Sequence, residues 1–531
     1  MVRIPYYEEM RDVDDVRQGM HTYEHSHPHD DDHDHDHDHD HDHEPELIGG
    51  EPKTQIRTAV VIVHGMGEQE PLDMLNKFVK TVLPKIEDER FYYSRPEKIT
   101  DSYEARRYLA PAKNVRGNSV YGQTEFFEYH WSYKMQGNKL GDIVPTLRRI
   151  LLRGPSNVPY GLKRIWWIVW FVIALFVAGA IAAVIAGIII EEFTLGGVIA
   201  VLVGQSILAS VLVWGLKKAG NVVTKSFVDV ARYLDKSPRS YDVRRSIRKG
   251  MVDLLQSLHD KGRYSRIVVV AHSLGAYIAY DGISYLWPQM SKLHMGPIDD
   301  QTNDPKPLVG LVELEEAAAD IQSHPIEDLS ADQEAGLEEF RKRQFALWKG
   351  LRNQGNPWLI TDFISVGTPM YFADILFTKD RADFDQLLKT GELPICPPRP
   401  IGQSVEGTTP ADTEYSWNNR GRKVLFHGAP FAVVRWTNLF FRAENSWNGD
   451  WFGDALRPLF GTGIVDHLIE GNLPGRRTPG VAHGRYFSYP DAAGPKDIAT
   501  LLQDYIKLNI DDELEDLLRA PGYLAESDIT R

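Results

Sequence analysis

The five residues AHSLG at 271–275 carry the strongest signal for chemistry in this chain. They follow an uninterrupted apolar run at 267–270 and lead into a stretch that favours a helix. A serine in a tight turn between a buried strand and a helix has its hydroxyl lifted above the sheet edge, where it can attack a carbonyl carbon. Small residues two before and two after it, here Ala271 and Gly275, relieve the crowding of such a turn. The pattern predicts a nucleophilic Ser273, with alanine where the first small residue is usually glycine.

Two other strand ends have residues suited to the same chemistry. The run 58–63 reads as a buried β-strand and is followed by HGMG at 64–67. The glycines allow the backbone to approach another group closely. The sequence ISVGTP at 364–369 is a further strand that ends in glycine and proline. Taken alone, His64 and Gly65 would fit an ordinary strand-to-helix turn equally well.

Together these three motifs resemble the lipase and esterase members of the α/β-hydrolase superfamily, over roughly residues 55–510 with insertions. The resemblance implies an α/β fold, with a mostly parallel sheet flanked by helices. It also implies a serine nucleophile, the chain order Ser, Asp or Glu, His, and cleavage of ester-type acyl bonds. Such a reaction requires no cofactor. The oxyanion hole would then consist of the backbone N–H groups of Met66 and Leu274.

The resemblance also indicates where the acid should lie, because in this family it occupies a loop after a late strand. The run 431–440 reads as that strand. Asp450, in the turn-rich sequence NGDWFG, is the preferred acid. The alternatives that remain are Asp454, Glu444 and Asp466.

The base is expected later still, just before the last helix. His483 lies there in the sequence GVAHGRY, and an aromatic residue follows it three positions on, as in lipases. His467 is the alternative, with a structural, hydrogen-bonded role as its simpler interpretation. His272, inside the turn of the nucleophile, is expected to pack there and not to act as the base. The predicted triad is Ser273, His483 and Asp450.

The charge of the chain is unevenly distributed. Its 531 residues carry a net charge of −15, but residues 1–50 alone hold sixteen acidic and three basic side chains. The remainder is nearly neutral, which argues against a nucleic-acid-binding surface. The only cysteine, Cys396, excludes an intramolecular disulfide and fits a reducing compartment. The first nine residues lack an apolar segment, so we expect no secretory signal.

Ten of the nineteen histidines lie between His21 and His43, mostly alternating with aspartate. Such a segment cannot bury a core, so we expect a disordered tail. Imidazole and carboxylate groups at this density would bind divalent metals loosely. A solvated tail with incidental metal affinity is the simpler interpretation, and a dedicated metal sensor or store is the alternative.

Two long apolar runs, 165–190 and about 195–216, predict a transmembrane hairpin. Each is long enough to cross a hydrocarbon core of about 30 Å as a helix. Their outer flanks are basic and the short connection is acidic, so both outer ends are expected in the cytoplasm. The basic flanking residues are Arg148, Arg149, Arg153, Lys163, Arg164, Lys217, Lys218 and Lys225.

The expected organisation places these insertions within one hydrolase domain. The hydrolase segments are 55–160, 219–289 and 358–510; the others are the acidic tail 1–54, the hairpin 161–218, a helical insertion or lid 290–357, and the C-terminal tail 511–531. We expect a serine hydrolase of lipid or other esters, held by two helices at the cytoplasmic face of a membrane. A thioesterase or amidase with the same triad is the enzymatic alternative. An inactive membrane scaffold with a metal-binding tail is the non-enzymatic one.

Overall fold

The computed structural model divides the chain into two compact units, Met1–Pro52 and Lys53–Arg531. The described residues all belong to the second unit. They are 54–66, 70–83, 93–99, 103–115, 120–135, 148–189, 229–290, 308–398, 416–419, 422–442, 449–469, 482–487 and 498–507, with short gaps at 149, 156–157, 159, 231, 236–237, 326–328 and 379. The expected tails 1–54 and 511–531 therefore lie outside the described residues, apart from Thr54.

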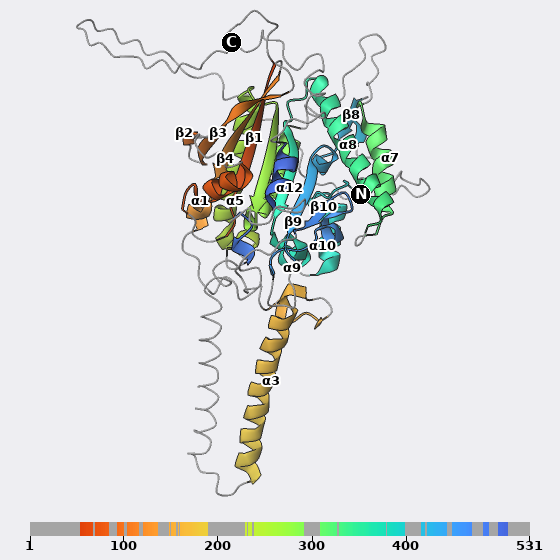
Figure 1. Ribbon diagram of the computed structural model, residues 1–531. Helices are drawn as coiled ribbons and strands as arrows, with labels where there is room; N and C mark the ends of the chain where they lie inside the picture. The colour runs from red at the N-terminus through yellow and green to blue at the C-terminus, as the bar shows by residue number, and fades with distance from the viewer. Residues whose placement is uncertain are drawn as a thin grey trace, which may run out of the picture. The chain divides into compact units, whose positions relative to one another are not determined.

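A single large sheet organises the described part of the chain. Its strands lie in the order β10-β9-β6-β5-β1-β4-β3-β2 (Figure 1). The six from β10 to β4 are parallel, whereas β3 and β2 run antiparallel at one edge. The strands are β1 (Thr54–Val63), β2 (Tyr93–Ile99), β3 (Glu104–Val115), β4 (Val120–Tyr129), β5 (Arg266–His272), β6 (Ile360–Val366), β9 (Arg435–Phe440) and β10 (Val465–Leu468), with a separate hairpin of β7 (Ser416–Asn419) and β8 (Arg422–Leu425).

Helices connect most of these strands. The α-helices are α1 (Asp73–Val82), α3 (Tyr160–Ile189), α5 (Pro238–Asp260), α6 (Leu274–Gln289), α7 (Leu311–Gln322), α8 (Ala331–Asn353), α9 (Ala373–Leu376), α10 (Arg381–Lys389), α11 (Arg457–Phe460) and α12 (Ile498–Ile506). Short 3-10 turns are η1 (Ser132–Met135), η5 (Pro369–Phe372), η6 (Pro430–Ala432) and η7 (Ala482–Gly484).

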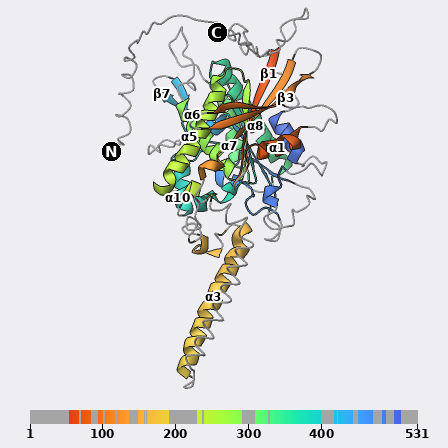
Figure 2. The same cartoon turned by 90° about the vertical axis from the view of Figure 1, so that its left-hand side faces the viewer.

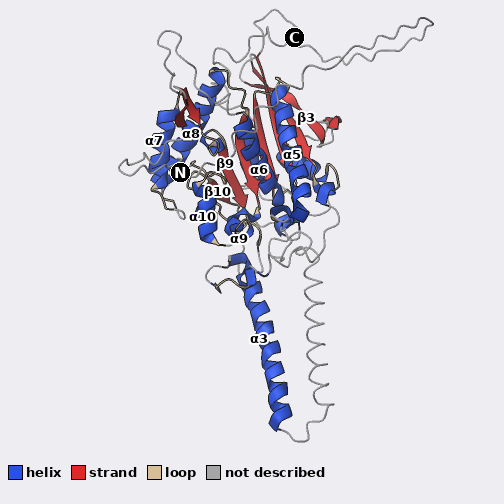
Figure 3. Cartoon of the chain, turned by 180° about the vertical axis from the view of Figure 1, so that it is seen from behind, coloured by secondary structure: helices blue, strands red, loops and turns tan. Residues whose placement is uncertain are grey.

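Apolar residues fill the runs 59–63 of β1 and 267–271 of β5, because both faces of the sheet are covered. In β1, Ala59, Val61 and Val63 face the core that contains α5 and α6, whereas Val60 and Ile62 face the core formed with α1 and α12. Figure 2 shows α5 and α6 on one side of the sheet and α1 on the other. In Figure 3, seen from behind, α5 and α6 cover the sheet. The predicted α/β class, with a mostly parallel sheet between helices, is confirmed.

The strand order creates a switch point at the centre of the sheet. β1 pairs with β4 on one side and with β5 on the other. The chain therefore crosses from one side of β1 to the other between β4 and β5. His64 and Gly65 follow β1, and Ser273 follows β5. The two motifs of the sequence thus lie at the same edge of neighbouring strands.

The insertion between α6 and β6 contains α7 and α8, as its sequence predicted. α8 packs against the sheet through buried polar contacts. Arg341 donates to the carbonyl oxygen of Trp436 and to the hydroxyl of Thr437 in β9. Gln344 donates to the carbonyl oxygen of Phe431. α8 is therefore part of the helical layer over the sheet.

The first apolar run forms the 30-residue helix α3. Among the described residues, no helix meets the requirements of length and apolar character for crossing a membrane. The side chains of α3 are described only in part, and the second run, 195–216, lies outside the described residues. The predicted two-helix hairpin is therefore not confirmed.

Candidate active site

Ser273 occupies a strained turn between β5 and α6. Its φ of 55° lies in the left-handed region, which costs a residue other than glycine about 1–2 kcal/mol. Two contacts with the end of β6 hold the turn in place. The Ser273 N–H donates to the carbonyl oxygen of Val366, at 2.9 Å, and the Thr368 hydroxyl donates to the Ser273 carbonyl oxygen, at 3.1 Å. The conformation that lifts the serine hydroxyl is thus fixed by the neighbouring strand.

Two glycines allow the ends of β1 and β5 to approach each other. A Cβ on Gly275 would lie against the carbonyl oxygens of Val63 and His64, at 2.6 Å from the latter. A Cβ on Gly65 would lie 2.9 Å from Cβ of Ser273 and 2.6 Å from Nδ1 of His272. Larger residues at either position would push the two strand ends apart. The glycines of both motifs therefore have the same function, which is to bring the loop after β1 against the serine.

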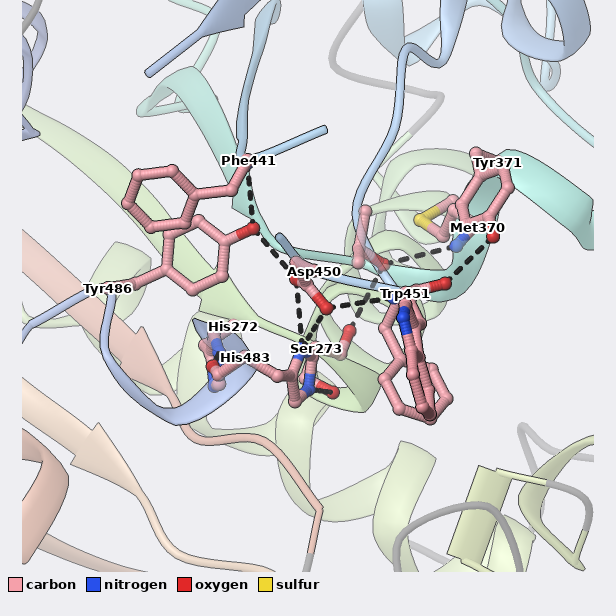
Figure 4. A network of polar contacts seen from close by, with 11 residues as sticks. His272, Ser273, Met370, Tyr371, Phe441, Asp450, Trp451, His483 and Tyr486 are labelled. Atoms are coloured by element: carbon pink, nitrogen blue, oxygen red, sulfur yellow. Dashed lines mark hydrogen bonds and ion pairs between the residues drawn. The ribbon is translucent and has the colours of Figure 1, made fainter. Parts of the chain in front are cut away.

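The structure joins Ser273, His483 and Asp450 in one chain of hydrogen bonds (Figure 4). Nε2 of His483 lies 2.8 Å from Oγ of Ser273, and its Nδ1 lies 3.0 Å from each oxygen of the Asp450 carboxylate. A carboxylate only accepts hydrogen bonds, so the imidazole proton is on Nδ1. Nε2 is then free to accept the serine proton. Ser273 is fully buried, whereas the side chain of His483 retains 13% exposure.

The Asp450 carboxylate is buried and has two further donors. The backbone N–H of Phe452 donates to Oδ1 at 2.8 Å, and the hydroxyl of Tyr486 donates to Oδ2 at 2.7 Å. The ring of Phe452 also packs against the imidazole of His483, with ring centroids 4.8 Å apart. These contacts stabilise the carboxylate and hold the imidazole of His483 in one orientation.

His272 packs beside the base, as expected, and supports it. Its Nε2–H donates to the main-chain carbonyl oxygen of His483, at 3.0 Å. Burial, followed by the proximity of His483, lowers the pKa of His272 well below its ordinary value. His272 therefore stays neutral and acts as a donor toward the loop of His483.

His64 fixes the loop after β1. Its Nδ1–H donates to the carbonyl oxygen of Gly65, at 2.9 Å, and its Nε2 accepts the backbone N–H of Trp131, at 3.2 Å. The indole N–H of Trp131 donates to the His64 carbonyl oxygen, at 3.0 Å. Burial lowers the pKa of His64 to about 3, so this tautomer remains neutral. The sequence motif indicated His64, but it gave no sign of its partner on the segment after β4.

The alternative acids have other partners or are not described. Asp466 accepts the backbone N–H groups of Leu456 and Arg457 at the start of α11, and burial raises its pKa to about 6. Asp454 accepts the N–H of Ala455 at 2.9 Å. Glu444 lies outside the described residues. Among the described candidates, Asp450 is the one that meets the base.

His467, the alternative base, lies on β10, and its Nε2 is 2.5 Å from the hydroxyl of Tyr505 in α12. This agrees with the structural role that its sequence context suggested. Within the described ranges, no three histidine, cysteine or acidic side chains are arranged to hold a metal ion.

Two supporting residues had no assigned role in the sequence. Thr368 follows β6 in the sequence ISVGTP and donates to the carbonyl oxygen of Ser273. Its position directly after a glycine at a strand end is the sequence feature that could have indicated this role. In the sequence, Tyr486 stands out only as the aromatic residue three positions after His483. Comparison with known proteins found no family model, curated protein or solved structure that matches the chain.

Proposed function

We propose that this protein is a serine hydrolase that cleaves carboxylic esters through Ser273, His483 and Asp450. The observation that carries the proposal is the continuous path from Oγ of Ser273 to Nε2 of His483 and from Nδ1 to the Asp450 carboxylate, with steps of 2.8 and 3.0 Å. This arrangement of nucleophile, base and orienting acid is the one that serine acyl transfer needs. It also speaks against an inactive scaffold.

The reaction follows from these positions. Oγ of Ser273 attacks the ester carbonyl carbon while Nε2 of His483 takes the hydroxyl proton. Asp450 stabilises the resulting imidazolium. As the tetrahedral intermediate collapses, the bond to the alcohol breaks and the imidazolium returns its proton to the leaving oxygen. Water, deprotonated by His483, then attacks the acyl-enzyme and releases the acid and free Ser273.

The oxyanion hole of this proposal consists of the N–H groups of Met66 and Leu274. Leu274 is the first residue of α6, and the first N–H groups of a helix have no acceptor within it. The positive end of the helix dipole also favours negative charge at this point. The close approach of Gly65 to Ser273 brings the loop that carries Met66 to the same side of the nucleophile. Two donors at this point would stabilise the developing charge.

A membrane location is the second part of the proposal, with lipid esters as the substrate class. α3 exposes large apolar side chains, including Trp167, Phe171 and Ile181. An exposed apolar surface of this kind is unusual in water and is typical of contact with lipid or a partner. The helix is proposed as the first half of a hairpin at 165–216, with the hydrolase in the cytoplasm.

The segment before α3 contacts the site edge of the sheet. Arg153 lies 3.6 Å from the carboxylate of Asp374 in α9, and α9 follows the 366–370 segment that holds Ser273. The indole N–H groups of Trp166 and Trp170 donate to the carbonyl oxygen of Leu151. The base of α3 is therefore fixed beside the carboxyl edge of the sheet. A membrane around α3 would lie next to the candidate site, which supports lipid esters as substrates.

Labelling with a fluorophosphonate tests the catalytic proposal, because this reagent phosphonylates only an activated serine. Membranes that contain the full chain should be labelled, and Ser273→Ala should abolish the label. Ser240→Ala is the control, since that buried hydroxyl donates to Asp235 and has no described histidine contact. A wild-type protein that is folded but takes up no label would contradict the proposal.

A further inference from the structure

Tyr486 joins the loops of the base and the acid through one hydroxyl group. It lies three residues after His483, donates to Oδ2 of Asp450 at 2.7 Å, and accepts the backbone N–H of Phe441 at 3.0 Å. Figure 4 shows the hydroxyl between Phe441 and the carboxylate. The geometry points to Tyr486 as a positioning residue that fixes the Asp450 carboxylate for His483, an inference that rests on the proposed hydrolase function.

The direction of the hydrogen bond is determined by its partners. The N–H of Phe441 can only donate, so it occupies an acceptor site of the hydroxyl oxygen. The one hydroxyl proton is left for Asp450. Burial and the nearby carboxylate keep the pKa of Tyr486 well above its ordinary value, so the phenol remains protonated. The carboxylate therefore has a constant donor on the oxygen that it also presents to His483.

The surrounding backbone is shaped to hold this ring. The Tyr486 side chain is buried and stacks on Phe441, with ring centroids 4.7 Å apart. A Cβ on Gly367 would lie 2.6 Å from Cζ of Tyr486. A Cβ on Gly453 would lie 2.8 Å from the hydroxyl and 2.9 Å from Oδ2 of Asp450. Two glycines thus make room for the ring and for its contact with the acid.

The hydroxyl connects three separate parts of the chain. Phe441 follows β9, Asp450 lies in the next described segment, and Tyr486 follows η7. Each triad loop is otherwise supported by different groups, namely Phe452 for the acid and His272 for the base. Tyr486 is bonded to the acid while it belongs to the loop of the base. Its loss should disturb the position of the two side chains relative to each other.

The experiment compares Tyr486→Phe with Tyr280→Phe in the full chain. Tyr280 is an equally buried tyrosine whose hydroxyl donates to the carbonyl oxygen of Pro394, at 2.7 Å, away from the triad. The rate of p-nitrophenyl butyrate hydrolysis is measured against pH, together with thermal unfolding. Tyr486→Phe removes the hydrogen bonds to Asp450 and Phe441, whereas Tyr280→Phe removes the one to Pro394, so Tyr486→Phe should lose more thermal stability.

We expect Tyr486→Phe to lower kcat about 10- to 100-fold, with KM within about twofold of wild type. The carboxylate, with one donor fewer, interacts more strongly with protonated His483. The acidic limb of kcat/KM should therefore move to higher pH. Tyr280→Phe should keep the kcat and the pH profile of the wild type. If Tyr486→Phe has the same kcat and the same pH profile as Tyr280→Phe, the positioning role is wrong, while the proposed hydrolase activity stands.

Gly453→Ala is the second variant, because it keeps the tyrosine and places a methyl group against both its hydroxyl and the carboxylate. Because this methyl group would push the two oxygen atoms apart, the variant should lower kcat as Tyr486→Phe does. It provides the test if Tyr486→Phe does not fold. Wild-type kcat in Gly453→Ala would overturn the inference. A wild-type protein that neither hydrolyses the ester nor reacts with a fluorophosphonate would overturn the proposed function and this inference together.

Discussion

Gly275 lies directly against the carbonyl oxygen of Val63, so the first turn of α6, the helix after Ser273, packs against the end of β1. The contact joins the two sequence motifs, because Val63 precedes His64 and Gly65. It leaves no space for a side chain at 275.

Gly275→Ala should therefore destabilise the protein. The added methyl group would meet main-chain atoms, which cannot move aside as a flexible side chain can, so we expect a loss of about 1–3 kcal/mol. Chemical unfolding measured by tryptophan fluorescence checks this. Gly484→Ala is the control, since a Cβ there meets nothing within 4 Å. Equal stability of the two variants would contradict the tight packing of the turn.

The base assignment predicts different outcomes for two histidines. His483→Ala should lower kcat by about four orders of magnitude, because the serine loses its proton acceptor. His467→Ala should retain most of the activity, since His467 contacts Tyr505 in α12. Ester hydrolysis by both purified variants is the measurement. An inactive His467→Ala beside an active His483→Ala would reverse the assignment.

Asp450→Asn should lower kcat by a similar factor, because an amide can present its N–H₂ group to the imidazole and favour the wrong tautomer. Asp454→Asn is the matched control, as Asp454 contacts Ala455 and Arg442. The ratio of the two rates tests which carboxylate orients the base. Comparable losses in both variants would argue against Asp450 as the sole acid.

The raised pKa of the buried Glu128 predicts that the stability of the protein depends on pH. Burial raises its pKa to about 7, although the N–H of Leu72 donates to it at 2.6 Å. Between its unfolded pKa of 4.5 and about 7, the folded state binds the proton that the unfolded state has lost. The contribution of this group therefore falls as pH rises through that window. The full change is a few kcal/mol, since one pKa unit corresponds to about 1.4 kcal/mol.

Glu128→Gln should remove this dependence and stabilise the protein above pH 7, because a neutral amide oxygen still accepts the Leu72 N–H. Urea unfolding of wild type and variant at pH 5.5 and pH 8 gives the comparison. The variant should gain stability over the wild type at pH 8 and little at pH 5.5. An equal difference at both values would show that Glu128 does not titrate in this range.

The apolar surface of α3 predicts membrane retention. Phe171→Asp combined with Ile181→Asp should release part of the protein from membranes during alkaline carbonate extraction, because charges in hydrocarbon are costly. Val312→Asp is the control, at a position in α7 that is 59% exposed and outside the apolar runs. Hydrolysis of a soluble ester should be retained by all variants. Complete extraction of the wild-type chain would exclude the hairpin.

The sequence alone predicted the elements that build the sheet centre. Apolar, β-branched runs such as 58–63 and 267–270 form buried strands because only a sheet covered on both faces accommodates them. The edge strands β2 and β3 were not predicted. Their sequences are rich in charges and contain Pro96 and Pro111, and the pairing shifts at Pro96 and after Ala110. Such irregular strands have no clear apolar alternation.

Local sequence also indicated Ser273 as the candidate nucleophile, because the turn that it occupies requires small neighbours at fixed positions. It favoured Asp450 but left Asp454, Glu444 and Asp466 as alternatives, because all four follow the run 431–440. That choice depends on which one the loop of His483 meets, and those residues are far apart in the chain. Only the tertiary structure brings Nδ1 of His483 to Asp450 and the Tyr486 hydroxyl to the same carboxylate, because these contacts form between loops that the folded sheet places side by side.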